Sequence, residues 1–208
     1  MPCYEFQGIR PVVDPSSYVH PLASLIGDVI VGPGCFIGPC ASLRADFGRL
    51  LVEADANIQD CATVHVSTER DTVIRRGATI AHGAVIHGCE IGENCLIGIN
   101  AVVLDAAILG AECMIGAMSL VPHGLEAPER SLLMGVPARI VRTMSADEIG
   151  WRNDGDGEYQ LLTLEVQSSL RETEPLRQVE PHRRRTEIAA SPVRFGERTE
   201  TETARKPG

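Results

Sequence analysis

The sequence predicts a mainly β protein, a left-handed parallel β-helix of hexapeptide repeats that is followed by a C-terminal α-helix and a disordered tail. Two observations lead to this fold class. An aliphatic residue recurs every six positions through most of residues 19–121, and a small residue stands four positions after most of them. Composition agrees, because only 4% of the 208 residues are aromatic while 20 are glycine. A narrow prism filled by aliphatic and small side chains has this composition.

The repeat positions define the predicted strands. They are Val19, Leu25, Val31, Ile37, Leu43, Val52, Ile58, Val64, Ile74, Ile80, Ile86, Ile91, Ile97, Val103, Leu109, Ile115 and Val121. Each hexapeptide supplies one short strand and one turn, and three of them close a triangular coil of about 18 residues. Neighbouring coils are expected to stack about 4.8 Å apart, with the aliphatic side chains inside the prism.

The repeat and its limits divide the chain into five expected segments. They are a lead-in strand or cap (1–18), the β-helix (19–125), a Pro/Gly-rich exit segment (126–144), a C-terminal helix (145–172) and a charged tail that is expected to be largely disordered (173–208). Ser145 and Glu148 have the spacing of a capping box at the start of a helix, and a break in the helix is expected around 153–157.

Charge and composition exclude several classes of protein. A net charge of −9 argues against nucleic acid as a partner. No stretch of about 18 apolar residues is present, so no membrane span is expected. The first residues lack the pattern of a signal peptide, and the seven cysteines contain no CxxC pair. We therefore expect a cytoplasmic protein with reduced thiols.

The six-residue spacing fails after three repeat positions that share one face in successive coils, Leu43, Val64 and Ile86. The residues that directly follow them should form one outward column: Arg44, His65 and His87. Imidazole is a common zinc ligand, and two rings in adjacent rungs can reach one metal ion. The breaks in the repeat therefore predict a metal site.

A third ligand is expected from His82, which precedes His87 by five residues and belongs to the preceding face. A corner of the prism separates the two, so His82 is expected to complete the site of a neighbouring chain. The pattern predicts a homotrimer whose shared sites combine His65 and His87 of one chain with His82 of another. Three histidines and an open position are typical of a catalytic zinc site, where the pKa of bound water falls to about 7.

The same residues resemble the gamma-class carbonic anhydrase family. The resemblance covers residues 1–170, and its specific motifs are residues 42–46 (SLRAD), 57–60 (NIQD) and 82–87 (HGAVIH). It implies Zn2+, or Fe2+ or Co2+, bound by the three histidines across a trimer interface. It also implies roles for five further residues: Gln59 contacts the metal-bound water, Arg44 and Asp60 form an inter-subunit ion pair, Asp46 hydrogen-bonds near the site, and Tyr159 lies over the metal.

Further segments resemble a branch of this family that acts in phenylacetate catabolism; they are residues 11–13, 48–49, 100–103, 158–160 and 174–181. This implies a metal-dependent hydrolase of CoA thioesters, a thioesterase in which metal-bound hydroxide attacks the thioester carbonyl. Arginines 183–185 are candidates for the CoA phosphates, although a solvated tail is the simpler interpretation.

Three other functions stay open. The first alternative is a gamma-type carbonic anhydrase that hydrates CO2 reversibly. However, Phe47 stands where well-studied anhydrases carry a glutamate, and residues 66–73 contain only two acidic residues to export protons. The second alternative is a hexapeptide acyltransferase, and the third is a non-catalytic trimeric scaffold.

Overall fold

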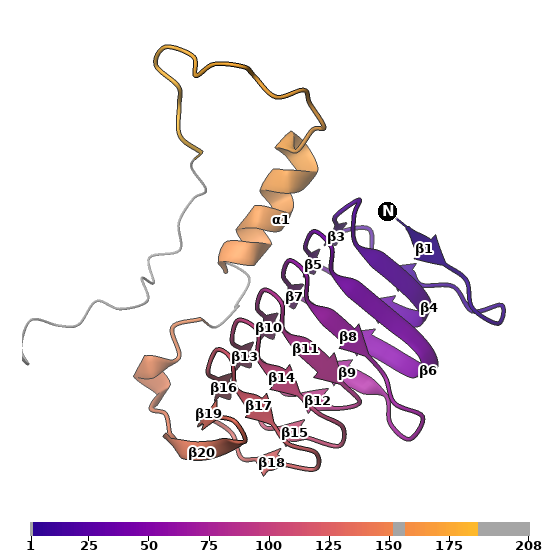
Figure 1. Cartoon of the computed structure of the whole chain (residues 1–208), viewed down its shortest axis with the longest axis vertical. Helices are drawn as coiled ribbons and strands as arrows, with labels where there is room; N and C mark the ends of the chain where they lie inside the picture. Colours follow the sequence, from indigo (N-terminus) through magenta and orange to yellow (C-terminus); the bar gives the residue numbers. More distant parts are fainter. Residues whose placement is uncertain (1, 152–156, 187–208) are drawn as a thin grey trace, which may run out of the picture.

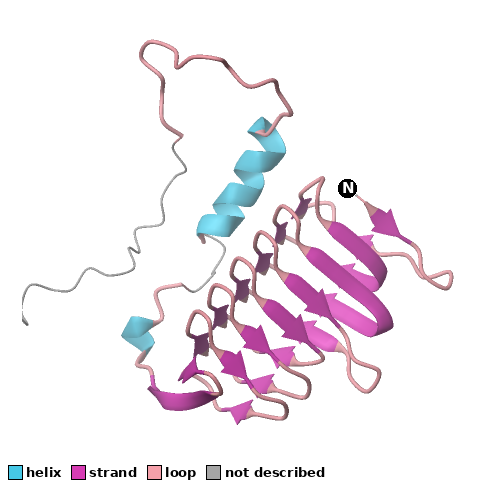
Figure 2. Cartoon of the chain, viewed as in Figure 1, coloured by secondary structure: helices cyan, strands magenta, loops and turns pink. Residues whose placement is uncertain are grey.

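The computed structural model describes residues 2–151 and 157–186 and confirms the predicted left-handed parallel β-helix with one C-terminal α-helix. Figure 1 shows the coils stacked along one axis, with short strands aligned in rows and turns between them. Figure 2 shows that strands make up almost all the regular structure before the helix. The tail that is expected to be disordered lies outside the described residues from 187 onward.

Hydrogen bonding between successive coils arranges the strands on three faces. The first face holds β6 (Ser42–Val52), β8 (Thr63–His65), β11 (Val85–His87), β14 (Val102–Val103) and β17 (Leu120–Val121). The second holds β9 (Thr72–Ile74), β12 (Glu90–Ile91), β15 (Ile108–Leu109) and β18 (Glu126–Ala127). The third holds β3 (Tyr18–Val19), β5 (Phe36–Ile37), β7 (Asn57–Ile58), β10 (Thr79–Ile80), β13 (Leu96–Ile97), β16 (Met114–Ile115) and β19 (Ser131–Gly135).

Two long strands bend across the corner between the first and second faces. The first part of β6 pairs with β8 and its last part pairs with β9. β4 (Ser24–Val31) follows the same path beside β6, with a register irregularity between Gly27 and Val29. The N-terminal strands β1 (Cys3–Tyr4) and β2 (Val12–Val13) pair with β4, so the expected cap is part of the sheet.

The core consists of the two predicted columns. Side chains at the aliphatic positions from Leu25 to Val121 are almost completely buried, and each stacks on its equivalent in the next coil. The small column is buried as well, with Cys35 and Cys95 at 0% exposure alongside the alanines. The close stacking of the coils also explains why residue 98 is a glycine, because a Cβ there would lie only 2.5 Å from the backbone nitrogen of Ala117.

Helix is expected over 145–172 with a break around 153–157; residues 152–156 lie outside the described residues, and the parts on either side of them differ in structure. β20 (Ala138–Thr143) pairs antiparallel with β19 and ends the solenoid. Ser145 and Glu148 do form the predicted capping box, but it opens only the 3-10 helix η1 (Ala146–Glu148). Buried Trp151, whose Nε1 donates to the Asn94 carbonyl at 2.8 Å, fixes this segment against the coils.

The α-helix itself is α1 (Glu158–Ser169), and it lies along β5 and β3 (Figure 1). The Tyr159 ring packs against the Phe36 ring, with centroids 5.2 Å apart. Gln160 is buried and its Nε2 donates a hydrogen bond to the Asp55 carbonyl. Neither helix in the described ranges has the length and apolarity needed to cross a membrane.

Candidate metal-binding site

The column of residues at the end of the first face has the predicted register. Arg44 pairs with His65, and His65 pairs with His87, in three successive rungs. The preceding residue of each is a completely buried aliphatic side chain that points into the prism. Because side chains alternate along a strand, the two histidines and the arginine project from the other side. The structure therefore places two imidazoles one rung apart at this corner.

Hydrogen bonds join this column into a chain that ends in a carboxylate on each side. His65 Nε2 lies 2.8 Å from Asp46 Oδ1, and His87 Nδ1 lies 2.7 Å from Asp105 Oδ1. Between the two rings, His65 Nδ1 lies 3.0 Å from His87 Nε2. Asp46 also accepts a hydrogen bond from Arg44 Nη1 at 2.5 Å.

Both carboxylates are held in their ionised form. Burial raises the pKa of Asp46, but its hydrogen bonds with His65 and Arg44 outweigh burial, and the pKa lies below its usual value. Burial likewise raises the pKa of Asp105, and hydrogen bonding and charge interaction with His87 bring it below its usual value. An ionised carboxylate only accepts hydrogen bonds, so the ring nitrogen that faces it must carry a proton.

In the neutral form of both rings, the two inner ring nitrogens would then face each other without protons. A neutral imidazole carries its proton on one nitrogen and a lone pair on the other. Two lone pairs at 3.0 Å repel each other unless a cation, either a proton or a metal ion, lies between them. Two ligand nitrogens of a tetrahedral zinc ion lie about 3.3 Å apart, which is close to this spacing. The donor set of His65 and His87 therefore fits two ligands of one metal ion.

His82 lies at a different corner of the prism, in the turn between β10 and β11. Its Nδ1 is 2.9 Å from Asp60 Oδ2, so a carboxylate again occupies one ring nitrogen and leaves Nε2 available. Among the described residues of one chain, no cluster of three or more His, Cys, Asp or Glu side chains has a metal-binding arrangement. The third ligand thus remains a prediction about a neighbouring chain.

Gln59 and Tyr159 lie on the same side of the fold as His82. Gln59 directly precedes Asp60, is only 5% exposed, and donates from Nε2 to Asn57 Oδ1 at 3.0 Å. Burial raises the pKa of Tyr159 to about 12, and the negative charge of Asp60 contributes to this increase. The Tyr159 hydroxyl therefore stays protonated at neutral pH and can donate a hydrogen bond.

The predicted site residues thus form two separate groups. We call the first the His65 half-site; it comprises Arg44, Asp46, His65 and His87. We call the second the His82 half-site; it comprises Gln59, Asp60, His82 and Tyr159. Arg44 and Asp60, the expected inter-subunit ion pair, belong to different groups and have 42% and 45% side-chain exposure. Within this chain each has another partner, Asp46 for Arg44 and His82 for Asp60.

Sequence reasoning missed Asp105. Ile86 pairs with Val103, so Leu104 is the equivalent of His87 in the next coil, and Asp105 stands one position beyond the column that counting identifies. Phe47 also differs from expectation: it occupies a position that holds a small inward residue elsewhere, yet its side chain is 56% exposed. The strand β6 continues through this position, and the Phe47 ring covers His65 with centroids 5.5 Å apart.

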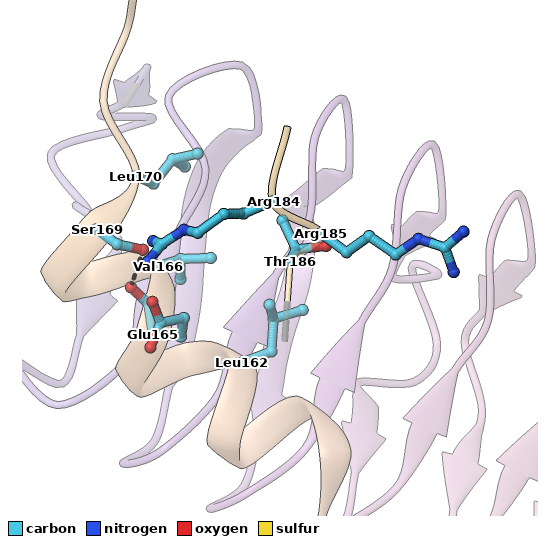
Figure 3. Close-up of a pocket in the computed structure, with 8 residues that line it drawn as sticks. All are labelled: Leu162, Glu165, Val166, Ser169, Leu170, Arg184, Arg185 and Thr186. Carbon is cyan, nitrogen blue, oxygen red and sulfur yellow. Dashed lines mark hydrogen bonds between the residues drawn. The ribbon is translucent and has the colours of Figure 1, made fainter. Parts of the chain in front are cut away.

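One cavity borders the His65 half-site, and another lies beside α1. The first has a volume of about 420 Å³, and its lining combines the apolar side chains of Phe6, Ile9 and Phe47 with charged residues: Asp28, Asp46, Arg49 and Asp71. A second, of about 930 Å³, lies between α1 and the segment that follows it (Figure 3). Figure 3 shows Arg184 extended toward Ser169 and Arg185 pointing away from the helix. Two of the three candidate phosphate ligands, Arg184 and Arg185, therefore line one cavity, whereas Arg183 pairs with Glu180 at 2.6 Å.

The fold and the repeat define the class of this chain: it is a hexapeptide-repeat protein. The family model "Bacterial transferase hexapeptide (six repeats)" matches residues 88–123. The chain belongs to the hexapeptide-repeat family that includes the carnitine operon protein CaiE. It is 50% identical to that protein of Escherichia coli strain K12 / DH10B over 185 residues, covering 89% of this chain and 94% of the relative. The equivalent protein of strain O7:K1 is 49% identical over the same coverage.

A solved structure agrees with the family. The hexapeptide transferase family protein from Anaplasma phagocytophilum is 31% identical, with a TM-score of 0.74, and the match covers 78% of this chain and 96% of that protein. The curated relatives are carnitine operon proteins, so they do not reproduce the narrower expectation of a phenylacetate-degradation protein. The family model, the relatives and this solved structure therefore agree on the hexapeptide-repeat family.

Proposed function

We propose that this protein is a metal-dependent hydrolase of CoA thioesters, with active sites shared between the subunits of a homotrimer. The observation that carries the proposal is the pair of imidazole nitrogens at 3.0 Å, each in a ring whose other nitrogen faces a carboxylate. A bound zinc ion would polarise a carbonyl and lower the pKa of water. His65 and His87 would hold it from one chain, and His82 from the next.

The two half-sites complement each other in a head-to-tail arrangement. One carries the exposed cation Arg44, and the other carries the exposed anion Asp60. A cyclic trimer places different surface patches of its subunits against each other, and each interface then contains one copy of each half-site. This arrangement supplies all three histidines to each interface and pairs the two charges.

The remaining side chains have roles that match their surroundings. The Tyr159 hydroxyl stays protonated and can donate to a thioester carbonyl oxygen as negative charge develops on it. The Gln59 amide can orient the attacking water. The cavity lined by Phe6, Ile9 and Phe47 offers apolar surface next to His65 for the acyl group. Arg184 and Arg185 line the cavity beside α1 and can contact phosphate groups.

The family favours one competing function of a different kind. The matching model describes hexapeptide transferases, so acyl transfer from CoA to an acceptor is the main alternative. An acyltransferase of this fold does not need three histidines with carboxylate partners, and we therefore prefer hydrolysis. The relatives are named for the carnitine operon, so acyl groups of carnitine metabolism join phenylacetate-derived ones as candidate substrates.

The test is an assay of the purified protein with its metal content measured. We expect hydrolysis of a subset of CoA thioesters, loss of activity with a chelator, and recovery with Zn2+, Fe2+ or Co2+. The His65→Ala variant should lose both metal and activity, whereas His123→Ala, in a turn of a later coil, should keep both. Rapid metal-dependent CO2 hydration without thioester hydrolysis would establish the anhydrase instead. Product that appears only with an acyl acceptor would establish the transferase.

A further inference from the structure

We propose that Asp105 is a positioning residue that holds the proton of His87 on Nδ1 and thereby presents Nε2 to the metal. This inference rests on the metal site of the proposed function. Asp105 is absent from the motifs that relate this chain to its family, and it comes from a third coil, after β14. Its carboxylate Oδ1 lies 2.7 Å from His87 Nδ1, the shortest of the histidine–carboxylate distances at the site.

The contact between Asp105 and His87 determines which ring nitrogen of His87 is available to a metal ion. His87 faces Asp105 with Nδ1 and His65 with Nε2. If the proton moved to Nε2, the lone pair would point at the carboxylate and the metal-facing nitrogen would be blocked. A carboxylate behind a ligand histidine fixes the tautomer and orientation of the ring. At 34% and 35% side-chain exposure, His87 and Asp105 are also shielded from much of the solvent.

The turns around Asp105 hold its carboxylate close to His87. Gly88 follows His87 with φ of +54°, and a Cβ there would lie 2.4 Å from Asp105 Oδ1. The backbone nitrogen of Ala106 donates to the Gly88 carbonyl at 2.8 Å, which ties the turn after Asp105 to the turn after His87. Ser67, from the loop after β8, also hydrogen-bonds the Asp105 carboxylate. The carboxylate is therefore held from two sides.

The experiment compares Asp105→Asn and Asp105→Glu with a matched control, Glu53→Gln. Glu53 carries a carboxylate that binds Arg75 at 2.8 Å, at the corner after the second face. Competition with a chelator measures Zn2+ affinity, and the visible spectrum of the Co2+-loaded protein reports the geometry of its ligands. We expect Asp105→Asn to bind Zn2+ about 10- to 100-fold more weakly. Asp105→Glu should restore part of the affinity, and Glu53→Gln should match the wild type.

A second measurement is independent of metal and activity. Nitrogen-15 spectra of the metal-free protein should show the His87 proton on Nδ1 in the wild type and a mixture of tautomers in Asp105→Asn. If Asp105→Asn does not fold, Ser67→Ala removes the second contact of the carboxylate and should weaken Zn2+ binding by a smaller factor. Wild-type protein that binds metal together with Asp105→Asn of unchanged affinity would overturn this inference alone. Wild-type protein that binds no metal would overturn the proposed function as well.

Discussion

Mixing two inactive variants tests whether the active site is shared between chains. His82→Ala keeps the His65 half-site but lacks the third ligand, and His87→Ala keeps the His82 half-site but lacks a metal ligand of its own column. Each variant alone should therefore be inactive. The structure motivates the experiment because His82 lies in the turn before β11 whereas His87 is the last residue of β11, at the far end of that strand.

The expected recovery follows from the geometry of a cyclic trimer. In a random one-to-one mixture, about three quarters of the re-formed trimers contain both variants. In each of these, one interface of the three joins an intact His65 half-site to an intact His82 half-site. About one quarter of all sites in the unfractionated mixture is therefore rebuilt, and trimers purified for both variants should recover about one third of wild-type activity and metal content.

The assay requires proof that subunits have exchanged. The two variants carry different tags, are unfolded together and refolded, and trimers with both tags are purified by sequential affinity steps. Wild-type protein treated identically sets full activity, and each variant refolded alone sets the background. Trimers that demonstrably contain both chains but show only background activity would refute the shared site. Metal retained by His82→Ala alone would refute it equally.

Two further predictions concern the stability of the fold. Ile86→Ala should lower the free energy of unfolding by about 2–5 kcal/mol, because the Ile86 side chain has 0% exposure within the core. The control Ile108→Ala should lower it much less, because Ile108 is 37% exposed. Urea denaturation measures both losses, and equal losses would contradict the prediction. Stability should also fall above about pH 9, because burial raises the pKa of Cys35 and of Cys89 to about 12. Above that pH the thiols of the unfolded chain release protons that the folded thiols retain, so each thiol lowers the free energy of unfolding by about 1.4 kcal/mol per pH unit up to its folded pKa. In the double variant Cys35→Ala, Cys89→Ala, the free energy of unfolding should therefore decrease less steeply with pH.

The repeat predicted the scaffold well because a β-helix translates sequence spacing directly into position. Each repeat position marks one face of the prism, so counting repeat positions in threes placed Leu43, Val64 and Ile86 on the same face despite the irregular spacing between them. The C-terminal region had no such rule. There the Ser145 capping box suggested the start of the C-terminal helix, but at this point the chain forms one 3-10 turn and is anchored by Trp151.

The site was predicted less completely than the scaffold, and Asp105 shows why. Counting along the repeat identifies which residues share a column, but it does not show how far a side chain in a neighbouring turn reaches. Asp105 follows Leu104 and therefore stands one position beyond the column, yet the tight Gly88 turn brings its carboxylate to His87. Phe47 likewise lies on a strand that continues past the expected turn, so its ring covers His65 instead of entering the core.

The geometry of the column explains why a third ligand should come from another chain. Rungs lie about 4.8 Å apart, so a metal ion with bonds of about 2.1 Å reaches rings in two adjacent rungs but not a third ring beyond them. The positions on either side of the two histidines in the column also hold no metal ligand. Arg44 pairs with His65 on one side, and on the other side stands Leu104, the residue after Val103, which pairs with Ile86. The nearby carboxylates of Asp46 and Asp105 already hold the outer ring nitrogens. A column of this fold can therefore supply two ligands and their carboxylate partners, and a different corner of a neighbouring subunit is the place from which we expect the third.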